Sequence, residues 1–187
     1  MVIRKGKHYA SRNLLPAFRI GTRVDRRRVM FPPSCRYDIG KDQTDVNKLY
    51  GVAYVSFAAI IFVLKSYLSA IANRDLKLVK SLHHYNSVRF GWWYNPIIDK
   101  IEFYSYCYNK GERSYEHLAS IPFSMYVDCV INPLDDYRHE LKLFKETGYL
   151  ASMSVQVETS WLSYELGPYF GGDIPAPHDF QIFMQTL

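Results

Sequence analysis

Six runs of alternating apolar and polar residues, separated by short turn-rich segments, dominate the chain after Ser81. In the first run Val88, Phe90 and Trp92 share one face, because successive side chains of a strand point to opposite sides. Short strands at this spacing, with no βαβ rhythm between them, are typical of antiparallel sandwiches and jelly rolls. The sequence therefore predicts a mainly β fold, an antiparallel, jelly-roll-like β-sandwich. The runs are Val88–Tyr94, Ile101–Tyr108, Met125–Val130, Tyr137–Phe144, Met153–Glu158 and Phe180–Met184.

Two of these runs allow more specific predictions. The segment 109–112, Asn-Lys-Gly-Glu, is a hairpin signal that follows the second run. In the last run Phe180, Ile182 and Met184 are expected to point into the core, and the same alternation places Phe183 on the wet side.

The cysteines and the length of the chain indicate that folding needs neither disulfides nor a structural metal. A chain of 187 residues can bury one sizeable core without metals or disulfides. Its three cysteines have no zinc-ligand spacing, and an odd number argues against a secreted disulfide framework. We expect reduced, partly buried thiols and no cofactor or metal.

The first 28 residues hold nine Lys or Arg and a single acid, a balance of +8 in a chain of net charge +5, so the remainder sums to −3. The sequence predicts a basic, extended N-terminal arm over residues 1–34 and a sandwich domain over 35–187. Such arms bind nucleic acid, acidic protein surfaces or anionic membranes, and a solvated tail is the alternative. The basic residues are Arg4, Lys5, Lys7, Arg12, Arg19, Arg23, Arg26, Arg27 and Arg28.

Residues 51–64 are uncharged and mostly apolar, and after Lys65 a second apolar stretch reaches Ala72. Fourteen residues are too few to span a bilayer, and a longer span would bury the Lys65 cation in lipid. We expect a buried strand from Leu49 to continue into one short apolar helix that ends near Asn73. No apolar segment suited to a signal peptide follows the basic N-terminus, so the expected location is a virion or the host cytoplasm.

Two polar groups are candidates for a shared site. In a closed sandwich distant strand ends can meet, so the two groups could ligate a divalent metal or orient an imidazole for acid–base chemistry. The alternative, favoured because the spacing matches no metal motif, is a hydrogen-bonded network that pins two loops. One group comprises His83, His84, Asn86 and Arg89, and the other His178 and Asp179.

Four aromatic side chains, Trp93, Tyr104, Tyr106 and Tyr108, fall on one face of two neighbouring runs. Flat aromatic faces stack on sugar rings, so this aromatic strip could bind a glycan; ordinary packing between sheets or subunits is the alternative. The chain has no GxSxG, HExxH or P-loop motif. It is therefore predicted not to be an enzyme, and no small-molecule substrate is expected.

Two ordered sets of short motifs lie within residues 34–184. They are Ser34–Asp38, Asn47–Gly51 and His83–Trp92, and then Pro168–Gly172 and Ala176–Asp179. Together these motifs resemble a group of small β-rich proteins from Bacteroidetes bacteria and their tailed, crAss-like phages. The resemblance implies a β fold and a phage or bacterial host, and it implies no particular activity. Trp93, where that group has Arg, and the apolar stretch 52–72 depart from the pattern.

These observations favour a non-catalytic structural or interaction protein. We expect a virion component, such as a decoration, fibre-anchor or connector protein, whose basic arm contacts neighbouring subunits and could reach nucleic acid. A carbohydrate-binding β-sandwich module is one alternative, and a membrane-associated bacterial protein is another.

Overall fold

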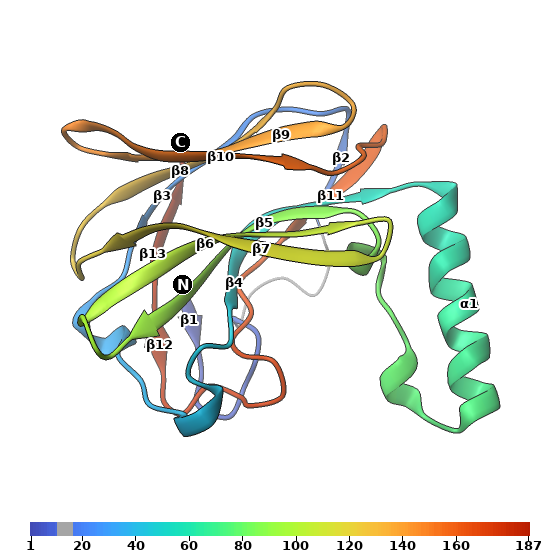
Figure 1. Cartoon of the computed structure of the whole chain (residues 1–187), viewed down its shortest axis with the longest axis horizontal. Coiled ribbons are helices and arrows are strands. Elements are labelled where there is room, and N and C mark those ends of the chain that lie inside the picture. Colours follow the sequence, from blue (N-terminus) through green and yellow to red (C-terminus); the bar gives the residue numbers. More distant parts are fainter. Residues whose placement is uncertain (11–16) are drawn as a thin grey trace.

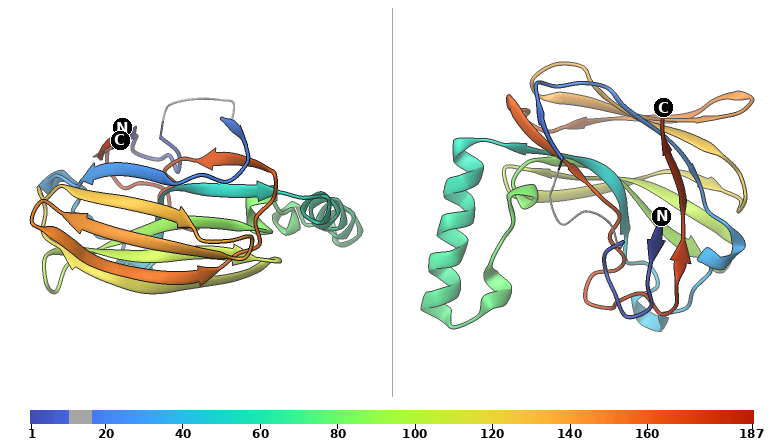
Figure 2. Two further views of the ribbon diagram at one scale, coloured as in Figure 1. Left: turned by 90° about the horizontal axis from the view of Figure 1, so that it is seen from above. Right: turned by 180° about the vertical axis from the view of Figure 1, so that it is seen from behind.

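The computed structural model describes residues 1–10 and 17–187 of the chain. Two large antiparallel sheets lie face to face as the layers of a sandwich, and the one α-helix of the described residues projects from one side (Figures 1 and 2). The predicted mainly β, antiparallel sandwich is confirmed.

The strands fall into three sheets. The six-stranded sheet runs β2 (Phe18–Ile20), β11 (Leu162–Leu166), β4 (Asn47–Val55), β5 (Ser87–Asn95), β6 (Lys100–Asn109), β7 (Glu112–Ile121). The five-stranded sheet runs β10 (Gly148–Gln156), β9 (Arg138–Lys145), β8 (Val127–Pro133), β3 (Asp25–Met30), β13 (Phe183–Thr186). A small third sheet pairs β1 (Val2–Ile3) with β12 (Phe180–Gln181). The helices are α1 (Phe57–Asn73) and the 3-10 turns η1 (Pro33–Cys35), η2 (Gly40–Asp42), η3 (Leu76–Leu78) and η4 (Leu82–His84).

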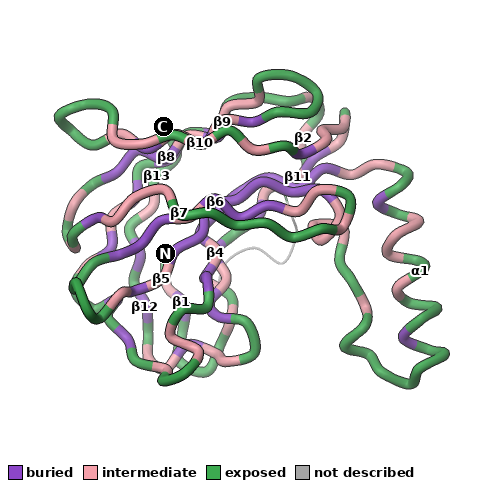
Figure 3. Tube along the Cα trace, in the orientation of Figure 1, coloured by how far each residue is buried: buried purple, intermediate pink, exposed green. Residues whose placement is uncertain are grey.

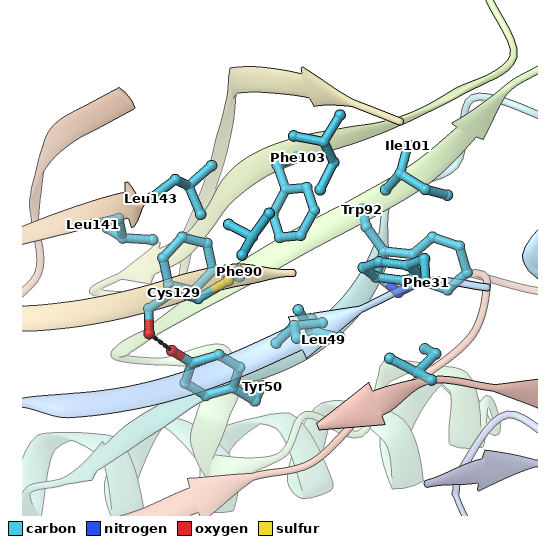
Figure 4. Close-up of a cluster of buried hydrophobic side chains, with 14 of the residues drawn as sticks. Phe31, Leu49, Tyr50, Phe90, Trp92, Ile101, Phe103, Cys129, Leu141 and Leu143 are labelled. Carbon is cyan, nitrogen blue, oxygen red and sulfur yellow. Dashed lines mark hydrogen bonds between the residues drawn. The ribbon is translucent and has the colours of Figure 1, made fainter. Parts of the chain in front are cut away.

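The core lies between the two large sheets, where their inward-facing side chains meet (Figure 4). Trp92 and Phe103 of the six-stranded sheet pack with Phe31, whose ring centroid lies 4.8 Å from that of Trp92. The Tyr50 hydroxyl crosses the sandwich and donates a 2.6 Å hydrogen bond to the Cys129 carbonyl. The strands contribute mostly alternate residues to this core, as period 2 requires, and β4 breaks the alternation at a bulge, where both Leu49 and Tyr50 are buried in it.

The hairpin and the last run follow the predicted pattern. The β6–β7 connection has positive φ at Lys110 (52°) and Gly111 (91°), the backbone of a two-residue hairpin turn. Phe180 and Ile182 are buried, Met184 packs against the core, and Phe183 is exposed (Figure 3). The register expected for the C-terminal segment is confirmed, although the segment divides into β12 and β13.

The N-terminal segment is not a separate arm. Residues 25–30, expected to belong to the extended arm, are an interior strand of the five-stranded sheet, with β8 on one side and β13 on the other. Alternation explains the difference, because Asp25, Arg27 and Val29 point inward as one buried face. Ile3 of β1 is also buried in the core.

The buried strand expected from Leu49 covers less of the apolar run 49–64 than predicted. The strand β4 ends at Val55 and the helix begins directly afterwards, eight residues before Lys65. Ser56 accounts for this, because its side-chain oxygen accepts a hydrogen bond from the Ala59 backbone N–H and caps the helix. The helix ends at Asn73, as expected, with Arg74 in the left-handed region.

Candidate functional site

The face of the six-stranded sheet that points away from the core carries tyrosines and cations. Arg89 of β5 lies beside Tyr106 of β6, which in turn pairs with Tyr115 of β7. On its other side Arg89 is opposite Gly51, where a Cβ atom would lie 2.6 Å from the Arg89 side chain. Gly51 is thus required by the close approach of the arginine stem. We call this surface the tyrosine–cation face.

Arg89 is buried in this face, with 6% of its surface exposed. One guanidinium nitrogen donates to the Gly167 carbonyl at 2.7 Å, while its Nε finds no acceptor among the residues that the structure describes. Burial lowers the pKa of Arg89 to about 10, against the opposing effect of neighbouring tyrosines. The arginine therefore remains a cation at neutral pH, and its hydrogen-bonding capacity is only partly used.

Lys48 is the second cation of the face and comes from β4. It is opposite Gly91, two residues along β5 from Arg89 and on the same side of the sheet. Its Nζ lies 4.8 Å from the Tyr106 ring centroid and 5.5 Å from that of Tyr169. Burial, and then the charge of Arg89, lower the pKa of Lys48 to about 8. Two cations therefore share one partly enclosed surface.

The predicted polar group before β5 lies at the border of this face. The rings of His83 and His84 are tilted against each other with their centroids 4.1 Å apart, and His84 meets the Tyr108 ring edge-on. Burial lowers the pKa of His83 to about 3 and that of His84 to about 4, so both are neutral at pH 7. Asn86 is instead buried and accepts the Lys110 N–H at 2.7 Å, which pins the β6–β7 hairpin.

The aromatic strip lies on the same face and is not a continuous open platform. The Trp93 indole N–H donates to the Tyr104 hydroxyl at 3.1 Å. Tyr106 is only 4% exposed and stacks with Tyr115. Tyr108 meets both Tyr106 and His84 edge-on. The structure therefore unites the strip with Arg89, His83 and His84, which the sequence treated separately.

A carboxylate cluster that the sequence did not indicate lies at the other end of the face. Glu102 is buried and accepts hydrogen bonds from Asn95, His117 and Ser120. Burial opposes its ionisation, but these hydrogen bonds hold its pKa below the ordinary value. The same His117 Nε2 faces both the Ser120 hydroxyl and the carboxylate. A catalytic relay would need Ser120 on one ring nitrogen of His117 and Glu102 on the other, and this arrangement is not formed. The hydrogen bonds instead hold the neighbouring strands together.

The second predicted group is elsewhere. His178 Nε2 is 2.9 Å from the Ser34 carbonyl oxygen, and the Asp179 carboxylate accepts from Arg4 and from the Lys5 N–H. These contacts pin the N-terminal residues to the last loop, as the loop-pinning alternative proposed. In residues 1–10 and 17–187 no group of three or more His, Cys, Asp or Glu side chains is placed to hold a metal.

Most basic residues of the expected arm are paired within the chain. Arg19 and Arg27 form a largely buried network between the sheets with Asp25 and Glu165. Arg26 and Arg28 share Asp128, and Arg4 pairs with Asp179. The exposed remainder is Lys5, Lys7 and Arg23, while Arg12 lies outside the described residues.

Helix α1 presents a large apolar surface to solvent (Figure 3). Only Ala59 and Ala70 are buried, on the side that faces η3 and η4. The opposite side is the α1 stripe, whose members recur at intervals of three and four residues and thus share one helical face. No helix in the described part of the chain combines the length and hydropathy needed to cross a bilayer. The α1 stripe consists of Phe57, Ile60, Ile61, Leu64, Tyr67, Leu68 and Ile71.

An open pocket of about 390 Å³ lies at one end of the sandwich. Trp161 and Tyr137, which are 70% and 60% exposed, line it together with Asp136 and Glu158. The residues come from three connections that are distant in sequence, so no local pattern indicated the pocket.

Comparisons with models of protein families, with curated proteins and with solved structures gave no match. The site must therefore be interpreted from its own chemistry. Sequence reasoning missed Lys48, because only strand pairing places it beside Arg89. The α1 stripe had a signal, its spacing of three and four, but the whole apolar run was interpreted as buried.

Proposed function

We propose that this chain is a non-catalytic structural subunit of a protein assembly and that α1 is the element that docks one copy on another. The assembly that the resemblance to phage proteins favours is a virion, in which the chain would act as a decoration, fibre-anchor or connector protein. The single observation that carries the docking role is the exposed α1 stripe on a projecting helix (Figure 1). A contiguous apolar surface of this kind marks an interaction site.

The spacing of the stripe favours a helix of a second copy as its occupant. Phe57, Ile61, Leu64, Leu68 and Ile71 follow each other at intervals of four, three, four and three. This is the seam of a helix pair, in which each side chain fits between those of the facing helix. None of the five seam residues is charged, and Lys65 lies beside the seam rather than in it. Two copies can therefore pair along the seam without bringing like charges together there. Because α1 projects from the body, a neighbour can reach it.

The expected strength follows from the exposed area. Six large side chains of the stripe are 43–78% exposed, and completing the burial of each stabilises by about 1 kcal/mol. Burial of the stripes of two copies together stabilises the pair by about 12 kcal/mol. The loss of translational and rotational freedom when two chains associate costs roughly 4–15 kcal/mol. The pair is therefore weak alone, with a Kd of about 1 μM at the tightest, and further contacts in an assembly would add to it.

Sedimentation velocity over a micromolar concentration series tests the proposal. Wild type should associate reversibly, Leu68→Glu should remain monomeric, and the neighbouring off-stripe variant Ser69→Glu should behave as wild type. A wild-type chain that stays monomeric throughout, or a dimer indifferent to Leu68→Glu, would contradict self-association. Binding to anionic vesicles that Leu68→Glu abolishes would favour the membrane-associated alternative instead. The virion assignment is tested by incorporation into particles, which Leu68→Glu should reduce.

Glycan binding is a second candidate, and the open pocket rather than the aromatic strip favours it. Trp161 and Tyr137 offer free aromatic faces next to two carboxylates that can accept sugar hydroxyls. Isothermal titration with a panel of oligosaccharides should show heat that Trp161→Ala abolishes and that Trp93→Ala, on the aromatic strip, leaves unchanged. The candidate fails if no oligosaccharide binds, or if Trp93→Ala has the larger effect.

A further inference from the structure

We infer that Lys48 and Arg89 form a binding site for an oxyanion, that is, for a phosphate, sulfate or carboxylate group. The inference is independent of the proposed docking through α1. It rests on a buried arginine and a half-buried lysine that share one sheet face, on the lack of a counter-ion for either among the described residues, and on the neutral donors around them.

The two cations are close because the strands place them so. Lys48 is opposite Gly91, and Arg89 is the next residue of β5 on that face, so the two are diagonal neighbours. The Cα atoms of such neighbours are about 7–8 Å apart, which leaves both long side chains able to reach one ligand. Gly51 has no Cβ atom, which lets the Arg89 stem lie close against β4.

Neither cation is neutralised. No carboxylate oxygen lies within 4 Å of Lys48 or Arg89 in the part of the chain that the structure describes. The segment 11–16, Ser-Arg-Asn-Leu-Leu-Pro, contains no acid. Asp45 is the one carboxylate that raises the pKa of Lys48, and it does so less than Arg89 lowers it. A buried guanidinium whose Nε has no acceptor costs free energy that an arriving oxyanion would recover.

The same chain neutralises its other buried arginines. Arg19 and Arg27, at the sheet–sheet boundary, each contact both Asp25 and Glu165. Buried cations are therefore paired where they serve the fold. The unpaired state of Lys48 and Arg89 is specific to the outer face, which is where an external ligand can supply the charge.

The surroundings suit an oxyanion rather than a cation or an apolar ligand. His83 and His84 are neutral and offer N–H donors without adding charge, and both feel the field of Lys48 and Arg89. Tyr108, which meets the His84 ring edge-on, borders the same surface. Tyr9 is exposed and packs edge-on against Tyr169, whose ring Lys48 also contacts.

Isothermal titration calorimetry at constant ionic strength tests the site, with sodium phosphate, sulfate or acetate titrated against a chloride background. At least one oxyanion should bind with a stoichiometry of one and raise the thermal unfolding midpoint. Lys48→Met should weaken this binding by about 10-fold or more, as loss of a charge-assisted contact does. Lys100→Met, which removes an exposed lysine at the start of β6, should leave it unchanged.

The three titrants distinguish the class of ligand. Preference for phosphate and sulfate assigns a tetrahedral oxyanion, and preference for acetate assigns a carboxylate. The inference is overturned if no oxyanion binds better than chloride, if Lys48→Met binds as well as wild type, or if Lys100→Met weakens binding equally. Thermal melts of the same samples show that each variant is folded, so a loss of binding cannot be attributed to unfolding.

Discussion

Lys48→Met should increase the free energy of unfolding at pH 7, although it removes a functional group. The lysine is a cation in a partly enclosed site, and its pKa of about 8 lies well below the 10.5 of a free lysine. That difference corresponds to a penalty of about 3 kcal/mol for keeping the charged form at neutral pH. The contacts of the ammonium with the Tyr106 and Tyr169 rings offset about 1–2 kcal/mol of it. Methionine fills a similar volume without the charge, so we expect a net gain of about 1–2 kcal/mol.

The pH dependence separates this explanation from better packing. Folded wild type releases the Lys48 proton near pH 8, whereas the unfolded chain keeps it until about pH 10.5. Between these values the unfolded state binds more protons, so wild-type stability rises with pH. Methionine has no proton to release. The advantage of Lys48→Met over wild type should therefore shrink by about 2 kcal/mol between pH 7 and pH 9.5.

Urea unfolding of both proteins at pH 7 and pH 9.5, in buffers without phosphate or sulfate, measures the effect. Lys100→Met is the matched control and should follow wild type at both pH values. If Lys48→Met is less stable than wild type at pH 7, or if its advantage is the same at both pH values, the lysine is not held at an energetic cost. The case for an unsatisfied cation would then fail.

Three further predictions concern the fold. Ile182→Asp should lower the free energy of unfolding by more than about 4 kcal/mol, because it buries an unpaired charge. The exposed Phe183→Ser should change it by only about 0.5 kcal/mol, and equal urea midpoints for the two variants would contradict the register. Gly51→Ala should destabilise by more than about 2 kcal/mol, since its Cβ would lie 2.1 Å from the Val88 carbonyl oxygen, and a wild-type melting curve would refute this. The three thiols should resist Ellman's reagent until the chain unfolds, because all are buried, and rapid labelling of native protein would contradict that.

The strands of the sandwich could be predicted because their pattern is local. Val88, Phe90 and Trp92 alternate with outward residues, and burial on one face is sufficient to fix such a strand. The N-terminal segment could not be predicted in the same way. β3 is rich in arginine, and it is buried only because Asp25 and Glu165 neutralise the inward Arg27. The pair of Arg27 with Glu165 joins residues more than a hundred positions apart, and no window of sequence contains it.

The helix and the site were missed for different reasons. The apolar residues at the start of α1 were predicted to be buried in a strand. Hydropathy alone cannot distinguish a helix in the core from an exposed helix that binds a partner. Ser56, whose side chain caps the helix, was a usable boundary signal. For the tyrosine–cation face, the sequence supplied Arg89 and the tyrosines separately. Their convergence with Lys48 depends on the order β4-β5-β6, which alternation does not specify.

The α1 stripe and the Lys48–Arg89 pair are both places where the chain departs from what its own stability requires. An apolar stripe in water and an unneutralised pair of cations both lower the stability of the isolated monomer. A ligand that binds only the folded state raises its stability by mass action, whether that ligand is a second copy on α1 or an oxyanion on Lys48 and Arg89. If both surfaces are used, the monomer in simple buffer is the least stable form of the folded chain. Its unfolding midpoint should then rise separately with protein concentration and with oxyanion concentration, and Leu68→Glu should remove only the first dependence.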